Sequence, residues 1–471
     1  DLVTGGAAGR RRSGEVTPVK RWGLLAATAL PILFLTLSRG SAASTEEISV
    51  LCIICGWRGT SDAILNIALF LPFGVALGAF GRSASVAFLA GLSFSVGIEL
   101  MQFVIPNRSP GLGDLIYNSL GSGLGALIFL NRETLSAQGN PRLERRFTAA
   151  WGTFGLALLT FQAWLLGPAI PDRGHRLDWT PVTDYAMRYE ADVLGTSFAA
   201  ADLPAGDVPA GHPVYAEIGS STEIGVEFRA AEWPFGIAPI LRLRRGEIDD
   251  LFIGLDYRDI IVQYRSRGMA LRLDRPYPRW PRGARTWAPG DTIELRMSGI
   301  GDGIELAHSG GSIVPDSPKY DPGPVRITIP TARGWGFLMY PRWAARVTPK
   351  PLDFIWMFML ALPLGIWGVV GMSTRFAVAW IAALYLLPFV FPLVGPSLYG
   401  ALAVAMAVPL GLALHFVKGN PEPFKWWKPF HTLYDSALAG SPPTAEIDSP
   451  APVGGHERGS TTREEDEGEE R

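Results

Sequence analysis

The chain has 471 residues, of which 48% are hydrophobic and 18% are charged, and its mean hydropathy is +0.19. This composition is too apolar for an ordinary soluble protein and too polar for a chain that lies wholly in a membrane, so it predicts a mixed architecture. The formal net charge is −2, which does not indicate a nucleic-acid partner.

Eight apolar stretches have about the length that a helix needs to cross a hydrocarbon core of about 30 Å. They are residues 22–38, 63–81, 84–105, 113–131, 149–170, 353–372, 376–394 and 397–417. The first stretch also fits a signal peptide, because a basic segment precedes it and small residues follow it. We favour a retained span, since the chain continues into further apolar stretches.

The positions of lysine and arginine residues predict how the chain crosses the membrane. If the eight helices alternate across the membrane, the basic residues that flank them fall on one side: 10–12, 20–21, 82, 132, 142, 145–146, 375, 418, 425 and 428. That side is then cytoplasmic. Both termini are expected in the cytoplasm, and the block 173–348 is expected on the other side of the membrane. The sequence leaves the oligomeric state open.

In the block 173–348, the continuous apolar runs of the helices give way to runs in which apolar and polar residues alternate. Ile293, Leu295 and Met297 share one face of a predicted strand, and Glu294 and Arg296 share the other. Similar runs cover residues 214–221, 224–232, 238–245, 251–266, 303–311 and 324–330. Turn residues separate these runs and no amphipathic helix lies between them, so we predict an antiparallel β-sandwich of jelly-roll type.

The runs "PILRLRRG", "LFIGLDYRDIIVQYR" and "WAPGDTIELRMSGIGDGIEL" resemble the concanavalin A-like, laminin G-like family. The resemblance implies binding of carbohydrate or protein, often with calcium. Asp249, Asp250, Asp256 and Asp259 are either calcium ligands or ordinary turn residues, and we favour turns. Five tryptophans either stack on sugar rings or pack in the core: they are Trp233, Trp280, Trp287, Trp335 and Trp343. We therefore predict no metal and no cofactor.

The pattern divides the chain into five parts. A basic cytoplasmic N-terminus (1–21) precedes a five-helix bundle (22–172), the sandwich (173–348) and three closing helices (349–418). Residues 419–471 end in "REEDEGEE" and are expected to be a disordered acidic tail. Cys52 and Cys55 form a C-x-x-C that is half of a metal site, a disulfide or two apolar thiols; no second pair completes a zinc sphere.

Polar residues gather where the third and fourth apolar stretches meet. Glu99 and Gln102 lie on one face of the third, and Asp114 and Asn118 lie on a stripe along the fourth that continues in glycines. Ionisable groups are rare in membranes, where they usually face a cavity or a partner. With Arg108 in the connecting turn and Asn66 in the first turn of the second stretch, six polar residues are expected to converge at the external end.

This polar pattern resembles the VanZ-like family over about residues 50–131. The matching residues are Asn66, Phe70, Pro72 and Gly74, then Glu99 and Gln102, Arg108, and Asp114, Asn118 and Gly121. The resemblance implies a membrane protein of the bacterial cell envelope that is linked to resistance to glycopeptide antibiotics such as teicoplanin. It names a family and no reaction.

Two interpretations of the cluster stay open. Glu99 or Asp114 could act as a general acid or base while Arg108 clamps a phosphate, with the amides of the cluster, Asn66, Gln102 and Asn118, binding the substrate. Alternatively, the same groups pair with one another and hold the helices together. The hypotheses are recognition of a membrane lipid or a cell-wall or surface glycan, an enzyme acting on a lipid-linked phosphate, and a structural network beside a carbohydrate-binding sandwich. No inverted repeat supports a transporter.

Overall fold

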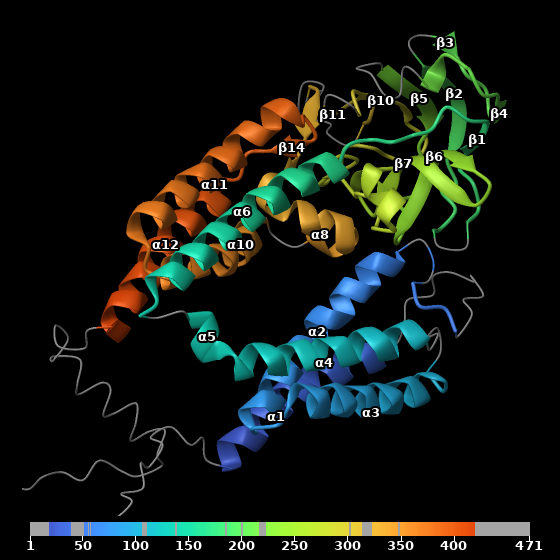
Figure 1. The fold of residues 1–471 in the computed structure, drawn as a ribbon. Coiled ribbons are helices and arrows are strands. Elements are labelled where there is room, and N and C mark those ends of the chain that lie inside the picture. Colours follow the sequence, from blue (N-terminus) through green and yellow to red (C-terminus); the bar gives the residue numbers. More distant parts are fainter. Residues whose placement is uncertain are drawn as a thin grey trace, which may run out of the picture. The chain divides into compact units, whose positions relative to one another are not determined.

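The computed structural model describes residues 18–38, 51–54, 56, 58–105, 111–136, 139–183, 186–198, 201–215, 223–300, 303–312, 323–346 and 349–419. Residues 1–17 of the basic N-terminus, Arg108, Cys55 and residues 420–471 of the acidic tail therefore lie outside the described residues. The described part contains two groups of helices and one β-sandwich (Figure 1).

A helix is present at each of the eight predicted apolar stretches. These helices are α1 (Pro18–Leu37), α2 (Gly59–Ala79), α3 (Ala84–Gln102), α4 (Leu112–Leu130), α6 (Pro141–Leu165), α10 (Pro349–Ile366), α11 (Val370–Val390) and α12 (Leu398–Gly419). Within the described residues, four of them are long and apolar enough to cross a membrane: α2, α3, α11 and α12. The structure thus supports a membrane protein, and passage of all eight helices stays a prediction.

The first group of helices, α1–α4, has its own apolar core. Ile32 of α1 packs with Phe70 and Phe73 of α2 and with Ile98 of α3, and all four are buried. Because α1 supplies one of these core residues, it is an integral part of this bundle. A short helix, α5 (Arg132–Ser136), follows α4.

Glycines allow α2 and α4 to approach closely. A methyl group on Gly121 would lie 2.4 Å from the carbonyl oxygen of Ile67, and one on Gly125 would lie 2.0 Å from that of Leu71. Neither position can hold a side chain unless the backbones separate. The glycine stripe predicted along the fourth stretch therefore faces α2.

The second group consists of α6, α10, α11 and α12. Leu159, Leu364, Trp380 and Val404, one from each helix, belong to a single buried cluster. The indole Nε1 of Trp380 also donates a hydrogen bond to the carbonyl oxygen of Gly152, at 2.9 Å. The chain leaves this group after α6, forms the sandwich and returns at α10.

The sandwich has two six-stranded antiparallel sheets, ordered β4-β1-β6-β7-β8-β9 and β12-β11-β10-β5-β2-β3 (Figure 1). The strands are β1 (His175–Trp179), β2 (Asp192–Phe198), β3 (Ala201–Asp202), β4 (Gly206–Val208), β5 (Glu223–Arg229), β6 (Ile237–Arg245), β7 (Ile248–Asp256), β8 (Asp259–Tyr264), β9 (Arg279–Trp280), β10 (Thr292–Ser298), β11 (Ile304–Ser309) and β12 (Val325–Ile327). Side chains of both sheets form one core. As the alternation predicts, Ile293, Leu295 and Met297 are buried in it.

Most predicted strand runs are strands in the structure, and two details differ. Val214 and Tyr215 lie in a helical turn, and the rest of the run 214–221 is outside the described residues. Ile329 is not part of β12; it lies in β13 (Ile329–Pro330), which pairs with β14 (Val394–Gly395). The alternating pattern did not predict the strands β1 to β4 and β9. These strands are mostly short or rich in charged residues and glycine, so a period of two is hard to detect in them.

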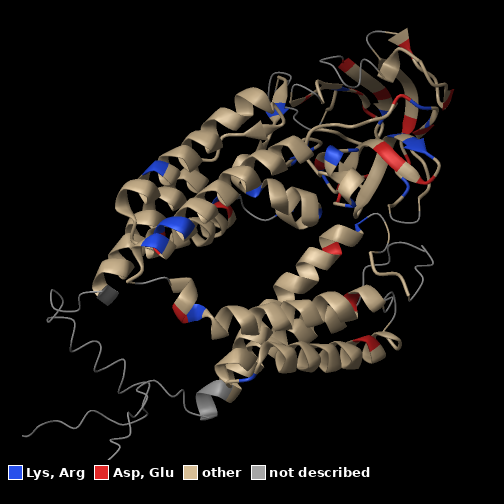
Figure 2. Cartoon of the chain, in the orientation of Figure 1, with Lys and Arg blue, Asp and Glu red and all other residues tan. Residues whose placement is uncertain are grey.

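Short helices connect the sandwich to its surroundings. They are η1 (Arg267–Leu271), η2 (Thr331–Arg333), α8 (Gly334–Met339) and α9 (Pro341–Arg346). Figure 2 shows that charged residues are sparse along the long helices and frequent on the sandwich. This distribution fits apolar helices in lipid and a sandwich in water.

Candidate functional site

Asn66 and Asp114 are in direct contact. The amide Nδ2 of Asn66 donates a hydrogen bond to Oδ1 of Asp114, at 2.6 Å, and so joins α2 to the first turn of α4. Asn66 does not lie in the first turn of its helix as predicted, because α2 begins at Gly59 and the residue falls in the third turn. The start of the helix was misplaced because Gly59 to Asp62 are not apolar.

Glu99 caps the start of α4. It lies in the last turn of α3, is buried, and its Oε2 accepts a hydrogen bond from the backbone N–H of Gly111, at 2.9 Å. Gly111 is the N-cap residue of α4, where unsatisfied N–H groups favour a negative charge. A methyl group on Gly111 would lie 4.0 Å from Oδ2 of Asp114. The two carboxylates therefore flank the same glycine.

Gln102 and Asn118 make separate contacts. Nε2 of Gln102 donates to the carbonyl oxygen of Thr36, at 3.0 Å, and ties α3 to α1. Nδ2 of Asn118 donates to Oγ of Ser95, at 2.9 Å, and ties α4 to α3. Asn118 is buried, and its Oδ1 has no hydrogen-bond partner within the described residues. A buried acceptor of this kind normally finds a donor, so it marks a place for a further polar group.

The predicted cluster is thus brought together only in part. Asn66, Asp114 and Glu99 gather around Gly111, whereas Gln102 and Asn118 face other neighbours. Arg108 precedes Gly111 by three positions and lies outside the described residues. Two carboxylates beside one glycine at the end of an apolar bundle are a candidate site for a polar ligand.

The Cys-x-x-Cys segment lies against the start of α4. Cys52 is disulfide-bonded, which selects one of the three predicted alternatives for this residue. A methyl group on Gly113 would lie 2.3 Å from the carbonyl oxygen of Ile53 and 3.6 Å from that of Cys52. The segment therefore packs beside the first turn of α4, next to Asp114.

A second buried polar cluster was not predicted. Nε of Arg333 donates to Oδ1 of Asp353 of α10, at 2.6 Å, and its Nη1 donates to the carbonyl oxygen of Ala344, at 2.9 Å. Nearby, Gln162 of α6 donates to the carbonyl oxygen of Thr331. Asp353 and Gln162 stand inside predicted apolar stretches, and this was the signal in the sequence that could have found them.

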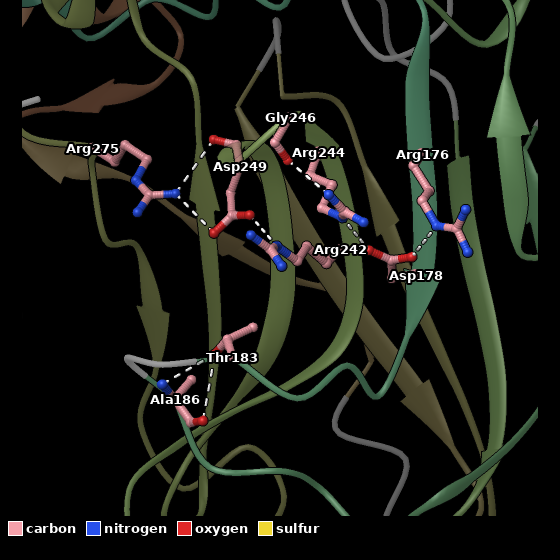
Figure 3. Close-up of polar contacts among 9 residues, drawn as sticks. All are labelled: Arg176, Asp178, Thr183, Ala186, Arg242, Arg244, Gly246, Asp249 and Arg275. Carbon is pink, nitrogen blue, oxygen red and sulfur yellow. Dashed lines mark hydrogen bonds and ion pairs between the residues drawn. The ribbon is translucent and has the colours of Figure 1, made fainter. Parts of the chain in front are cut away.

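The four aspartates considered as calcium ligands pair with basic side chains instead. Asp249 pairs with Arg242 and, at 3.1 Å, with Arg275 (Figure 3). The remaining pairs are Asp250 with His175 and Arg265, Asp256 with Arg346, and Asp259 with Arg279. Burial raises the pKa of Asp249 to about 6, and Arg275 opposes this rise. These aspartates lie at the ends of β7 and at the start of β8, and they act through ion pairs rather than turn geometry alone.

Arginine and aspartate also alternate across the neighbouring strands. Asp178 of β1 accepts from Nε of Arg176, at 2.9 Å, and from Nε of Arg244 of β6, at 2.6 Å (Figure 3). Among the described residues, no group of three or more His, Cys, Asp or Glu side chains is arranged to hold a metal ion. The polar face of this sheet is therefore an ion-pair network.

The tryptophans of the sandwich have structural neighbours. Trp287 is buried against Phe228, with ring centroids 5.5 Å apart, and Arg258 lies 3.7 Å above the ring of Trp233. Trp280 packs against His308, with ring centroids 5.2 Å apart. Core packing and a cation–π contact thus occupy three of the five tryptophans considered for sugar stacking.

Comparison with known proteins finds a family match for the region that contains the polar cluster. Residues 16–134 match the family model VanZ/LLP1, which covers α1–α4 and all six predicted cluster residues. No curated protein matches the chain. No solved structure matches it either. The chain therefore contains a VanZ-like domain, and the concanavalin A-like identity of the sandwich stays a prediction.

Proposed function

We propose that this is a cell-envelope protein of the bacterial plasma membrane whose VanZ-like bundle recognises the headgroup of a lipid or a lipid-linked glycan at the outer face. The role follows from the VanZ/LLP1 match together with apolar helices of membrane-spanning length. In this proposal all eight helices cross the membrane, both termini are cytoplasmic and the sandwich is outside. A link to glycopeptide resistance belongs to the same proposal.

The observation that carries the proposal is the placement of Glu99 and Asp114 around Gly111. Both carboxylates lie at one end of the bundle, where α3 ends and α4 begins, and not at the middle of the helices. A headgroup reaches such a position from the membrane surface without entering the hydrocarbon core. Arg108, three positions before Gly111, is the proposed contact to a phosphate or pyrophosphate, since a guanidinium binds these groups bidentately.

The buried side-chain oxygen of Asn118 supports the proposal of a ligand that carries a hydrogen-bond donor. Its Oδ1 is a buried acceptor with no partner within the described residues, one turn beyond Asp114. A hydroxyl or amine of a headgroup or sugar can satisfy such an acceptor. Ligand binding would then remove the cost of a buried unpaired oxygen, which is about 1–3 kcal/mol.

A second candidate is an enzyme that acts on a lipid-linked phosphate. Both carboxylates lie beside Gly111, where either one can take part in proton transfer to or from a bound substrate. In this alternative Glu99 or Asp114 accepts a proton from the attacking group, and Arg108 holds the phosphate. The sandwich would bring a surface glycan close to the bundle in either case.

The test compares the wild type with Glu99→Gln and Arg108→Ala in a cell that expresses the full chain. Teicoplanin susceptibility and the melting temperature of the purified protein in detergent are measured for each. Asn131→Ala is the matched control, because this exposed amide lies at the opposite end of α4 and, among the described residues, its side chain bonds the carbonyl oxygen of Leu127 alone, at 2.8 Å.

We expect both cluster variants to keep the wild-type melting temperature and to lose the phenotype, while the control keeps both. Loss of melting temperature and phenotype together would assign the cluster to helix packing. A phenotype that survives both substitutions would contradict the proposal. Turnover of a lipid-linked phosphate by the wild type, absent in Glu99→Gln, would favour the enzyme over the binding protein.

A further inference from the structure

The segment from Arg258 to Arg285 is strongly basic. It contains eight arginines and two aspartates and no other charged residue. Three of its arginines pair with carboxylates: Arg265 with Asp250, Arg275 with Asp249 and Arg279 with Asp259. These three are used by the ion-pair network of the sandwich. The arginines at the two ends of η1, Arg267 and Arg272, are used differently.

Arg267 and Arg272 contact backbone carbonyls instead of carboxylates. Nη1 of Arg267 donates to the carbonyl oxygen of Trp164, at 3.1 Å, and Nη1 of Arg272 donates to that of Ile54. Within the described residues, neither arginine has an acidic partner. A carbonyl does not neutralise a guanidinium, so both keep a full positive charge and donors for an anion.

Both arginines lie where long apolar helices end or begin. The backbone N–H of Arg267 bonds the carbonyl oxygen of Gly167, at 2.9 Å, directly after α6. The carbonyl oxygen of Arg272 accepts from the N–H of Thr60, at 3.3 Å, in the first turn of α2. At 1.5 Å per residue, α6 is about 37 Å long. Its last turn therefore lies at the level of the headgroups if the helix crosses the membrane.

Exposed apolar side chains surround the two arginines. Leu271, between them, is 45% exposed. Trp164 is also 45% exposed, stacks on Phe161 and lies under the guanidinium of Arg267 at 5.5 Å. Tryptophan, leucine and arginine side by side are typical of the boundary between headgroups and acyl chains.

Arg272 is also held in an uncommon conformation. Its φ is +54°, in the left-handed region that favours glycine or asparagine. Residues other than glycine adopt this conformation at a cost in backbone strain. This conformation ends η1, and the carbonyl oxygen of the same residue accepts the hydrogen bond from Thr60 of α2. The structure thus keeps an arginine at a position where glycine would suit the backbone better.

From these observations we propose that the arginines at the two ends of η1 bind the headgroup of an anionic phospholipid. Arg267 and Arg272 contact the phosphate region, and Leu271 and Trp164 contact the upper part of the acyl chains. The lipid thereby links α6 and α2 at the membrane surface. This site is separate from the cluster around Gly111 and does not depend on the function proposed for that cluster.

The experiment compares the full chain in nanodiscs of phosphatidylcholine alone with nanodiscs of equal parts phosphatidylcholine and phosphatidylglycerol. The readout is the melting temperature for the wild type, Arg267→Gln/Arg272→Gln and Arg282→Gln. Arg282 is the matched control: it is exposed, belongs to the same basic segment, and its backbone N–H bonds Asp259 at the opposite end of β8.

We expect phosphatidylglycerol to raise the melting temperature of the wild type by roughly 4–8 °C. The double variant should lose most of this rise and the control should keep it. An equal rise in wild type and double variant would overturn the proposal, as would an equal loss in Arg282→Gln. If inorganic phosphate added to phosphatidylcholine nanodiscs reproduces the rise, the site binds free phosphate and the lipid is excluded.

A single substitution tests the proposal even if the double variant does not fold. Arg272→Gln alone removes one exposed guanidinium and one hydrogen bond to a loop carbonyl. It should lose about half of the rise caused by phosphatidylglycerol, and high salt should abolish the rise in the wild type. A rise that persists unchanged in high salt would contradict an electrostatic contact.

Discussion

Asn66 of α2 donates a hydrogen bond to Asp114 of α4 at 2.6 Å, and this contact joins two helices that also approach through glycines. The hydrogen bond connects the amide of one predicted site residue to the carboxylate of another. It therefore serves helix packing and positions Asp114 at the same time.

The first prediction concerns this hydrogen bond. Asn66→Ala should lower the free energy of unfolding in mixed micelles by about 1 kcal/mol, because an interhelical hydrogen bond in a membrane protein is worth about that much. A double-mutant cycle with Asp114→Ala measures the coupling. If the two single substitutions are additive, the hydrogen bond contributes nothing to stability.

The second prediction concerns the close approach of α2 and α4. Gly125→Ala should destabilise the bundle by about 3 kcal/mol, since its methyl group would lie 2.0 Å from the carbonyl oxygen of Leu71. Gly97→Ala is the control in α3, where nothing lies within 4 Å of the added methyl group. That variant should be neutral or more stable by up to about 1 kcal/mol, because alanine favours the helix. Equal melting temperatures for the two variants would refute the close approach.

The third prediction concerns the buried pair of Arg333 and Asp353, whose side chains are 5% and 4% exposed. Asp353→Ala should cost about 3–5 kcal/mol, because it leaves a guanidinium buried without its partner. The double variant Arg333→Met/Asp353→Leu should cost less than that single substitution. Chemical or thermal unfolding of the three proteins decides the order, and a double variant less stable than Asp353→Ala would contradict it.

The fourth prediction concerns pH. Burial raises the pKa of Asp274 to about 6, although Arg58, at 3.1 Å, opposes the rise. The folded protein therefore keeps a proton on Asp274 between about pH 4 and pH 6, where the unfolded chain has lost it. Stability from this group should fall as pH increases through that window, by at most about 3 kcal/mol, and stay constant above it.

Asp274→Asn tests this pH dependence. The melting temperature of the wild type, followed from pH 4 to pH 7, should fall more steeply with rising pH than that of the variant. Asp249, whose pKa burial also raises to about 6, remains in both proteins and contributes equally to each curve. Parallel curves for the two proteins would show that Asp274 titrates as it does in the unfolded chain.

The amino-acid sequence by itself was enough to locate the long helices and most strands of the sandwich. Apolar run length places a helix such as α12, and the alternation from Thr292 to Ser298 places β10, because both patterns are local. The sequence also predicted a polar cluster, since Glu99 and Asp114 are exceptional in apolar stretches, and the structure brings Asn66, Glu99 and Asp114 of that cluster together. Its residue types and family pattern were visible without any tertiary contact, and the family model matches the same region.

The partner of each polar side chain was decided only by the tertiary structure. Gln102 shares a helix face with Glu99, yet it bonds Thr36 of α1, whereas Glu99 bonds Gly111. Likewise, the sequence suggested that the four aspartates of the sandwich are turn residues or calcium ligands. In the structure they form ion pairs with basic residues of other strands and loops, such as Asp249 with Arg275 and Asp259 with Arg279. Periodicity determines which face a residue occupies. The choice between ligand, ion pair and helix contact depends on groups that are distant in sequence, and packing alone brings those groups together.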